Sequence, residues 1–193
     1  MNALAFADAA RPTRCVILRL PMMDYSIGHE LLLLHERNAL IVPDDSATDE
    51  TYRFAILRAV MICSRSWEEN QRPMRWRRVW SWLARRCDLA AAIQAFREYR
   101  LAGVSMPEVK PIPGEKGRAL GGPHLARVLE FAMRLRGQEA FDMPFGLAQW
   151  LYYCGAESEG ACMMLSDEER EMESAKDALI AEIRKEKEAK WPA

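Results

Sequence analysis

The chain has 193 residues, of which half are apolar and 28% are charged, and its basic and acidic residues nearly cancel to a formal net charge of −1. This composition excludes a chain that is disordered throughout, and the length suits one main domain. The overall charge gives no reason to expect a nucleic-acid or membrane partner, and no run reaches the roughly 18 apolar residues of a membrane span. Five cysteines without close pairs are typical of free thiols in a reducing compartment, so we expect a cytoplasmic protein.

The N-terminal part of the sequence predicts a small β element beside a helix. The runs Cys15–Leu20 and Ala39–Val42 are rich in aliphatic residues, and a proline follows each of them. Proline cannot donate to a β ladder and therefore ends a strand. Short aliphatic runs that end at a proline are typical of short strands. They flank a segment with helical character, Ile27–Arg37, for which Ser26 is the candidate N-cap. We therefore expect the two runs to pair as a two-stranded element.

Helical patterns dominate the chain from Thr48 to about residue 102. Two acids followed by apolar residues at spacings of three and four predict a helix over Thr48–Ser64. Another helix is expected after Pro73, with one face formed by Trp76, Trp80, Leu83 and Cys87. Asp88 either caps a further helix or lies within one long continuous helix.

Residues 103–123 interrupt the helical pattern with five glycines and four prolines. Regular structure is not expected to persist there, and connections longer than about 12 to 15 residues are typically linkers or functional loops. We therefore divide the chain into an N-terminal helical part with short strands (residues 1–102), this connector, and C-terminal helices (residues 124–193). Together they are expected to form one compact domain.

Two helices are predicted directly after the connector. Pro123 suits the first turn of the first helix and Gly137 fits just past its end, with an inward face formed by Leu125, Val128, Leu129, Ala132 and Leu135. The second helix is expected to begin with Asp142 as its cap and Pro144 in its first turn. The short connection between them predicts an antiparallel hairpin.

A last helix is predicted from the pattern Ser166-Asp-Glu-Glu169, which is that of a capping box. Its narrow apolar stripe consists of Met172, Ala175, Leu179 and Ile183, while nine acids and six bases occupy residues 167–190. Such a helix packs along one seam, either on the body of the protein or on another chain. The fold class is therefore mainly α, a helical bundle with a small two-stranded element and a long Pro/Gly-rich connection.

No catalytic, cofactor or metal site is recognisable in the sequence. His29 and His35 lie six residues apart, about 240° around a helix, whereas a helical zinc pair needs a spacing of four. The glycine-rich segment before Pro123 lacks the Gly-Lys-Ser/Thr sequence of a phosphate-binding P-loop, and no serine or cysteine stands in a nucleophile motif. We therefore expect a non-enzymatic protein without a cofactor.

The most unusual local feature is residues 72–86, in which Arg and Trp alternate along a predicted helix. One interpretation places the tryptophans in the core and leaves the arginines in solvent or paired with the acidic C-terminal helix. A second makes this helix a protein-binding surface, and the candidates, with those of the C-terminal stripe, are Trp76, Arg77, Trp80, Arg85, Met172, Leu179 and Ile183. A third places nucleic-acid phosphates on Arg75, Arg77, Arg78, Arg85 and Arg86.

Two segments carry a resemblance to a known class of proteins, YSIGHELLLL at residues 25–34 and DMPFGLAQW at residues 142–150, the latter followed by Glu157–Gly160. Together they resemble small helical proteins of the tail-assembly-chaperone type, encoded in bacteriophage and prophage tail-gene clusters. The resemblance implies a non-enzymatic assembly or adaptor protein that binds a tail or other virion protein in the host cytoplasm. The alternative is a nucleic-acid-binding or regulatory protein that uses the Arg/Trp-rich helix.

Overall fold

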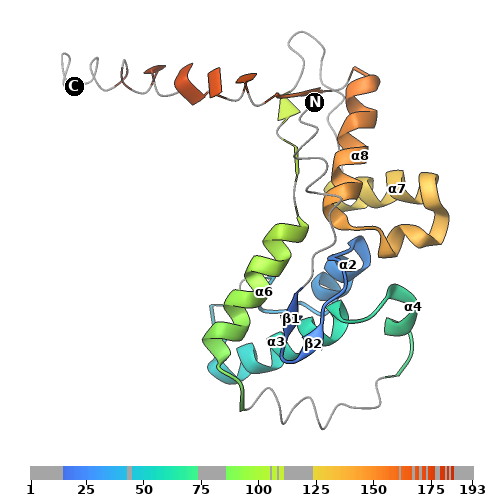
Figure 1. Ribbon diagram of the computed structural model, residues 1–193, viewed down its shortest axis with the longest axis vertical. Helices are drawn as coiled ribbons and strands as arrows, with labels where there is room; N and C mark the ends of the chain where they lie inside the picture. The colour runs from blue at the N-terminus through green and yellow to red at the C-terminus, as the bar shows by residue number, and fades with distance from the viewer. Residues whose placement is uncertain are drawn as a thin grey trace.

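The fold is that of a computed structural model, which describes residues 15–42, 45–73, 86–104, 106–107, 109–110, 124–160 and 162–166, and residues 168–169, 171–172, 174–176, 179–180, 182 and 184. This part of the chain is mainly helical and includes a small two-stranded antiparallel sheet near the N-terminus (Figure 1). The predicted fold class is therefore confirmed.

The N-terminal sheet is a tight hairpin. Strands β1 (Val16–Ile17) and β2 (Leu20–Pro21) pair antiparallel, with Val16 opposite Pro21 and Ile17 opposite Leu20. The two residues between the strands, Leu18 and Arg19, have φ values of 51° and 66°. A type I′ turn requires positive φ at both central residues, and its twist matches that of the flanking strands. The strand pair is therefore local in sequence.

The predicted pairing of Cys15–Leu20 with Ala39–Val42 is wrong, because the second run forms turns instead of a strand. The backbone N–H groups of Ile41 and Val42 both donate to the Asn38 carbonyl at 2.9 Å, and the Leu40 N–H donates to the Asn38 side chain. The Asn38 amide in turn donates to the Ala55 carbonyl at 2.9 Å. The buried Asn38 therefore accepts hydrogen bonds from the backbone N–H groups that a partner strand would otherwise have accepted from.

Two helices of the N-terminal part begin at the residues that the sequence predicts, and a third begins at one of the two alternatives that the sequence left open. Helix α2 (Ile27–His35) has Ser26 as its N-cap, and α3 (Asp49–Cys63) has Thr48. Helix α6 (Leu89–Gly103) is capped by the Asp88 side chain, which accepts from the Ala91 N–H at 3.2 Å. Asp88 therefore starts a new helix, which decides between the two alternatives left open by the sequence.

Helix α4 (Trp67–Asn70) was not predicted. Ser66 and Glu69 form a capping box at its start, with the Ser66 N–H donating to the Glu69 carboxylate at 2.9 Å. The Trp67 N–H at the same end donates to Asp142 Oδ1 at 2.6 Å. Asp142 thus caps a short helix far away in the sequence, and the prediction that it caps the helix after it is wrong: Pro144 occupies that position.

The C-terminal part contains α7 (His124–Arg136), the 3-10 helix η1 (Gly137–Asp142) and α8 (Phe145–Ser158). Gly137 has a φ of 58°, as expected of a residue that ends a helix. The two α-helices cross, since His124 and Phe131, about two turns apart on α7, both contact Tyr152 (Figure 1). The predicted antiparallel hairpin is therefore wrong, because η1 turns the chain before α8 begins.

Residues from both sides of the connector share one main core. Ile27, Leu33, Ile56 and Val60 of the N-terminal part belong to the same buried cluster as Val128 of α7. On α7 the inward face is confirmed for Val128 and Ala132, which are buried, and for Leu125 and Leu129, which are half-buried, but Leu135 is 54% exposed at the last turn.

The connector contains a strand, against the expectation that regular structure stops there. Strand β3 (Val109–Lys110) pairs antiparallel with β4 (Met163–Met164). This pair adjoins a second, smaller cluster formed by the side chains of Trp150, Tyr153, Ala156, Cys162 and Met164. The connector thus places a strand beside the end of α8, where the last helix begins.

Candidate functional site

The last helix begins where the sequence predicts, at a complete capping box. The Ser166 N–H and hydroxyl both donate to the Glu169 carboxylate at 2.8 Å, and the Glu169 N–H donates to the Ser166 hydroxyl at 3.3 Å. These hydrogen bonds lower the pKa of the Glu169 carboxyl. The described residues from 168 to 184 are helical, and we refer to residues 166–184 as the C-terminal arm.

The C-terminal arm carries its apolar side chains into solvent. Met172 is 73% exposed, Leu179 57% and Ile180 39%, and the other described residues from 168 to 184 are exposed as well. Figure 1 shows these residues extending away from the body of the protein. Two of the predicted protein-binding residues, Met172 and Leu179, are therefore accessible, while Ile183 lies outside the described residues.

The Arg/Trp segment cannot be placed in the same way, because residues 74–85 lie outside the described part of the chain. This range includes most of the candidates for protein or nucleic-acid binding, namely Trp76, Trp80, Arg75, Arg77, Arg78 and Arg85. Arg86 is described, and it is exposed in a helical conformation just before the Asp88 cap. Arg72, at the other end, pairs with Glu68 on the surface at 2.5 Å.

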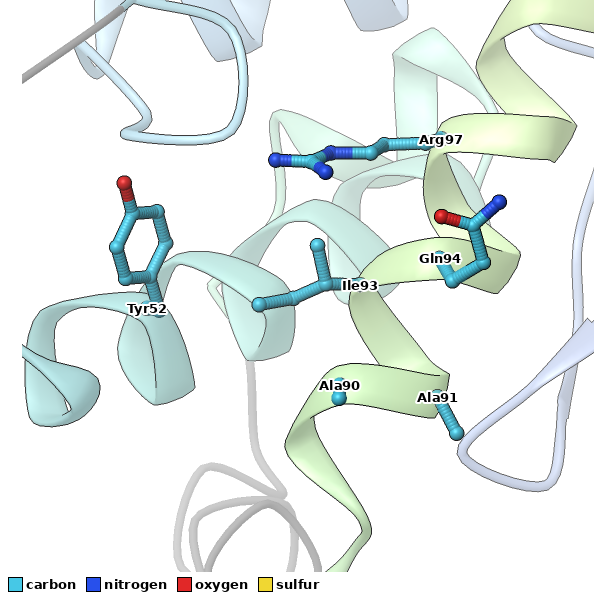
Figure 2. Close-up of a pocket in the computed structure, with 6 residues that line it drawn as sticks. All are labelled: Tyr52, Ala90, Ala91, Ile93, Gln94 and Arg97. Carbon is cyan, nitrogen blue, oxygen red and sulfur yellow. The ribbon is translucent and has the colours of Figure 1, made fainter.

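A groove of about 640 Å³ lies between α3 and α6 and has no counterpart among the predictions. It is lined by Tyr52, Ala90, Ala91, Ile93, Gln94 and Arg97. Figure 2 shows the Ile93 side chain directed toward Tyr52, with the Arg97 guanidinium extending over the same side. None of these six residues is buried, so the groove is a surface feature. No sequence signal could have found it, because it depends on how two helices pack.

A buried polar cluster joins α2 to α6. Glu30, which is 6% exposed, receives two hydrogen bonds from the Arg100 guanidinium, from Nε at 3.1 Å and from Nη2 at 2.7 Å. The Tyr25 hydroxyl donates to the same carboxylate. Burial and the neighbouring Glu30 charge raise the pKa of Tyr25, so its hydroxyl stays protonated as a donor. Each charge in the cluster has its partner, which is the arrangement of a structural ion pair.

In the part of the chain that the structure describes, the histidines take part in no group that could hold a metal ion. His29 Nδ1 accepts from the Ser26 N–H at 3.1 Å and Nε2 lies 2.8 Å from the Arg65 carbonyl, which fixes a proton on Nε2. Burial lowers the pKa of His29, so the ring is neutral and both nitrogens are engaged. His35 is exposed. Among the described residues no group of three His, Cys, Asp or Glu side chains could hold a metal ion.

The surroundings of four cysteines do not activate their thiols as nucleophiles. Burial raises the pKa of Cys15, Cys63, Cys154 and Cys162, which favours the unreactive thiol. Cys15, Cys63 and Cys162 are free thiols. The carboxylate of Glu157, near the second cluster, accepts from the Met164 N–H at 2.9 Å and so supports the loop before the C-terminal arm.

The chain matches no protein-family model, and no similar protein was found among curated proteins or solved structures. Within the described residues, no helix combines the length and apolar character needed to cross a membrane.

Proposed function

We propose that this protein is a non-enzymatic assembly or adaptor protein that binds another protein through its C-terminal arm. The observation that carries this proposal is the exposure of the apolar side chains of the arm, with Met172 at 73% and Leu179 at 57%. Met172, Ala175 and Leu179 lie three and four residues apart, on one face of the helix. A narrow apolar stripe of this kind fits a groove or another helix.

The stability of the arm also supports a binding role. An isolated helix of this length is only marginally stable in water, because helix nucleation is costly. The described residues from 168 to 184 are exposed, so packing on the body does not stabilise them. A partner that covers the stripe would stabilise the helix and bury the apolar area, which contributes about 25 cal/mol for each Å².

The class of partner comes from the resemblance to tail-assembly chaperones, which indicates a tail or other virion protein. In this proposal the body presents the arm, and the arm holds the partner until it is assembled. The body itself contributes no reaction chemistry to the proposal, because its buried carboxylate, histidine and thiols are held in structural contacts.

A capture experiment with the full chain tests this proposal. The tagged protein is used as bait in cells that express the neighbouring genes, and mass spectrometry identifies the captured proteins. We expect a tail or other virion protein with the wild type and much less of it with Leu179→Asp. Leu135→Asp is a matched control, because Leu135 is 54% exposed on a different helix. Equal capture by wild type and Leu179→Asp, or no virion protein at all, would contradict the proposal.

A further inference from the structure

Two cysteines lie close together at the end of α8, Cys154 within the helix and Cys162 in the loop that follows it. Gly160, which has a φ of 74°, turns the chain after the helix. The Cys162 thiol then donates to the Tyr153 carbonyl at 4.0 Å, and this carbonyl belongs to the peptide bond that joins Tyr153 to Cys154. The turn therefore returns the second cysteine to the backbone beside the first.

This contact limits the separation of the two cysteines. In a trans peptide the carbonyl oxygen lies about 3 Å from the next Cα, so Cys162 Sγ lies within about 7 Å of Cys154 Cα. A disulfide joins residues whose Cα atoms are usually about 4.4 to 6.8 Å apart. Rotation of both side chains and an adjustment of the loop around Gly160 can therefore bring the two sulfurs together.

The surroundings of the two sulfurs favour a disulfide over thiolates. Cys162 is 4% exposed in the cluster that contains Trp150 and Met164, and Cys154 packs against the same cluster. Burial raises the pKa of both thiols, and the Glu157 carboxylate adds to this effect. A disulfide is readily reduced when its surroundings stabilise the thiolates that reduction forms. Here the surroundings oppose thiolates, so an uncharged disulfide suits this apolar cluster and persists once it has formed.

We propose that Cys154 and Cys162 form a reversible disulfide under oxidising conditions, and that this bridge fastens the chain leading into the C-terminal arm to α8. The arm begins at Ser166, four residues after Cys162. The bridge closes a covalent loop over residues 154–162, directly before β4. The arm therefore stays attached at this point even when β3 and β4 separate. This inference concerns the control of the arm and goes beyond the identity of the protein that the arm binds.

The oxidant in this proposal is a low-molecular-weight disulfide, oxidised glutathione. Cys154 is half-buried and Cys162 is buried, so Cys154 reacts first. It loses its proton, its thiolate attacks one sulfur of oxidised glutathione, and one glutathione leaves. Cys162, deprotonated in turn, attacks the Cys154 sulfur of the mixed disulfide and releases the second glutathione. The two cysteines thus lose two protons and two electrons, which the oxidant takes up as it becomes two molecules of glutathione.

The first test maps the bridge in the full chain. The native protein is incubated with oxidised glutathione, the remaining thiols are alkylated, and the digested protein is analysed by mass spectrometry. We expect one disulfide, between the peptides of Cys154 and Cys162, which reduced glutathione reverses. Cys162→Ser should accumulate a glutathione adduct on Cys154, whereas Cys154→Ser should acquire at least about tenfold less on the buried Cys162. Cys15→Ser is the matched control, because Cys15 is also half-buried, and it should leave the bridge unchanged.

The second test measures the consequence for the arm by hydrogen exchange. The Met164 N–H donates to the Glu157 carboxylate at 2.9 Å, so its exchange reports the opening of the chain before the arm. We expect this exchange to be at least about tenfold slower in the oxidised protein, because the covalent loop restricts open conformations. Cys15→Ser should show the same slowing, whereas Cys154→Ser in the same oxidant should show none.

The outcomes that would overturn the inference are specific to the two cysteines. Alkylation of both Cys154 and Cys162 after oxidation, or a disulfide that includes another cysteine, would overturn the bridge. Equal exchange of the Met164 N–H before and after the bridge forms would overturn the fastening of the arm. Neither measurement involves capture of a virion protein through Leu179, so the proposed function stands or falls separately.

Discussion

Replacing Arg100 with methionine would remove the cation that faces the buried carboxylate of Glu30. The variant keeps most of the aliphatic length of the side chain, so packing against α2 changes little. The carboxylate keeps the Tyr25 hydroxyl as a donor but loses both guanidinium hydrogen bonds. A charge that is largely withdrawn from water would then have no counter-charge.

The size of the effect follows from the exposure of the two side chains. Breaking a buried ion pair from one side typically costs about 3 to 5 kcal/mol. The Glu30 side chain is 8% exposed but that of Arg100 is 31% exposed, so part of the pair is already screened by water. We therefore expect Arg100→Met to lower the free energy of unfolding by about 2 to 4 kcal/mol.

Urea-induced unfolding followed by circular dichroism measures this loss. The chain offers a matched control in the pair of Arg58 with Glu36, whose side chains are 31% and 28% exposed. Arg58→Met should cost less than about 1 kcal/mol, because both partners remain hydrated. Adding Glu30→Gln to Arg100→Met should regain part of the loss, since glutamine still accepts from Tyr25 and carries no charge. Equal costs for Arg100→Met and Arg58→Met would refute the reasoning.

Other predictions concern single positions in the core. Gly103→Ala places a Cβ 2.4 Å from the Tyr25 Cβ, so unfolding experiments should show a loss of about 1 to 3 kcal/mol, and an unchanged midpoint would contradict this. Burial lowers the pKa of His29, so the unfolded chain takes up the proton first and stability should fall as the pH drops below about 6.5. His29→Gln should flatten that part of the pH profile. Cys63 is fully buried, and we expect a thiol reagent to modify it only after unfolding; rapid labelling of the native protein would be inconsistent with its burial.

Sequence reasoning succeeded where structure is decided locally. The N-caps Ser26 and Ser166 were predicted, and Asp88 was one of two alternatives, because a capping side chain binds backbone groups only two or three residues away. The same local signal marks the start of α4, which was not predicted, because Ser66 and Glu69 form a capping-box pattern in the sequence.

Contacts between distant segments could not be predicted in this way. Asp142 was a reasonable cap for the helix that follows it, yet it binds Trp67, 75 residues away. Glu30 and Arg100 are separated by 70 residues, and neither residue type nor spacing marks them as a pair. The predicted pairing of Cys15–Leu20 with Ala39–Val42 was wrong for a related reason. The hairpin that turns at Leu18 and Arg19 closes a much shorter loop than that pairing would, and so costs less chain entropy.

The C-terminal arm leaves the body of the protein at a fixed point, at its first residues. Met164 and Leu165 are buried immediately before Ser166, so the chain is anchored to the body until the helix starts. A helix rises about 1.5 Å per residue, so Arg184 lies about 27 Å along the axis from Ser166. This distance is comparable to the diameter of a small domain. In the proposed function, a partner bound at the outer half of the arm would lie away from the surface of the body.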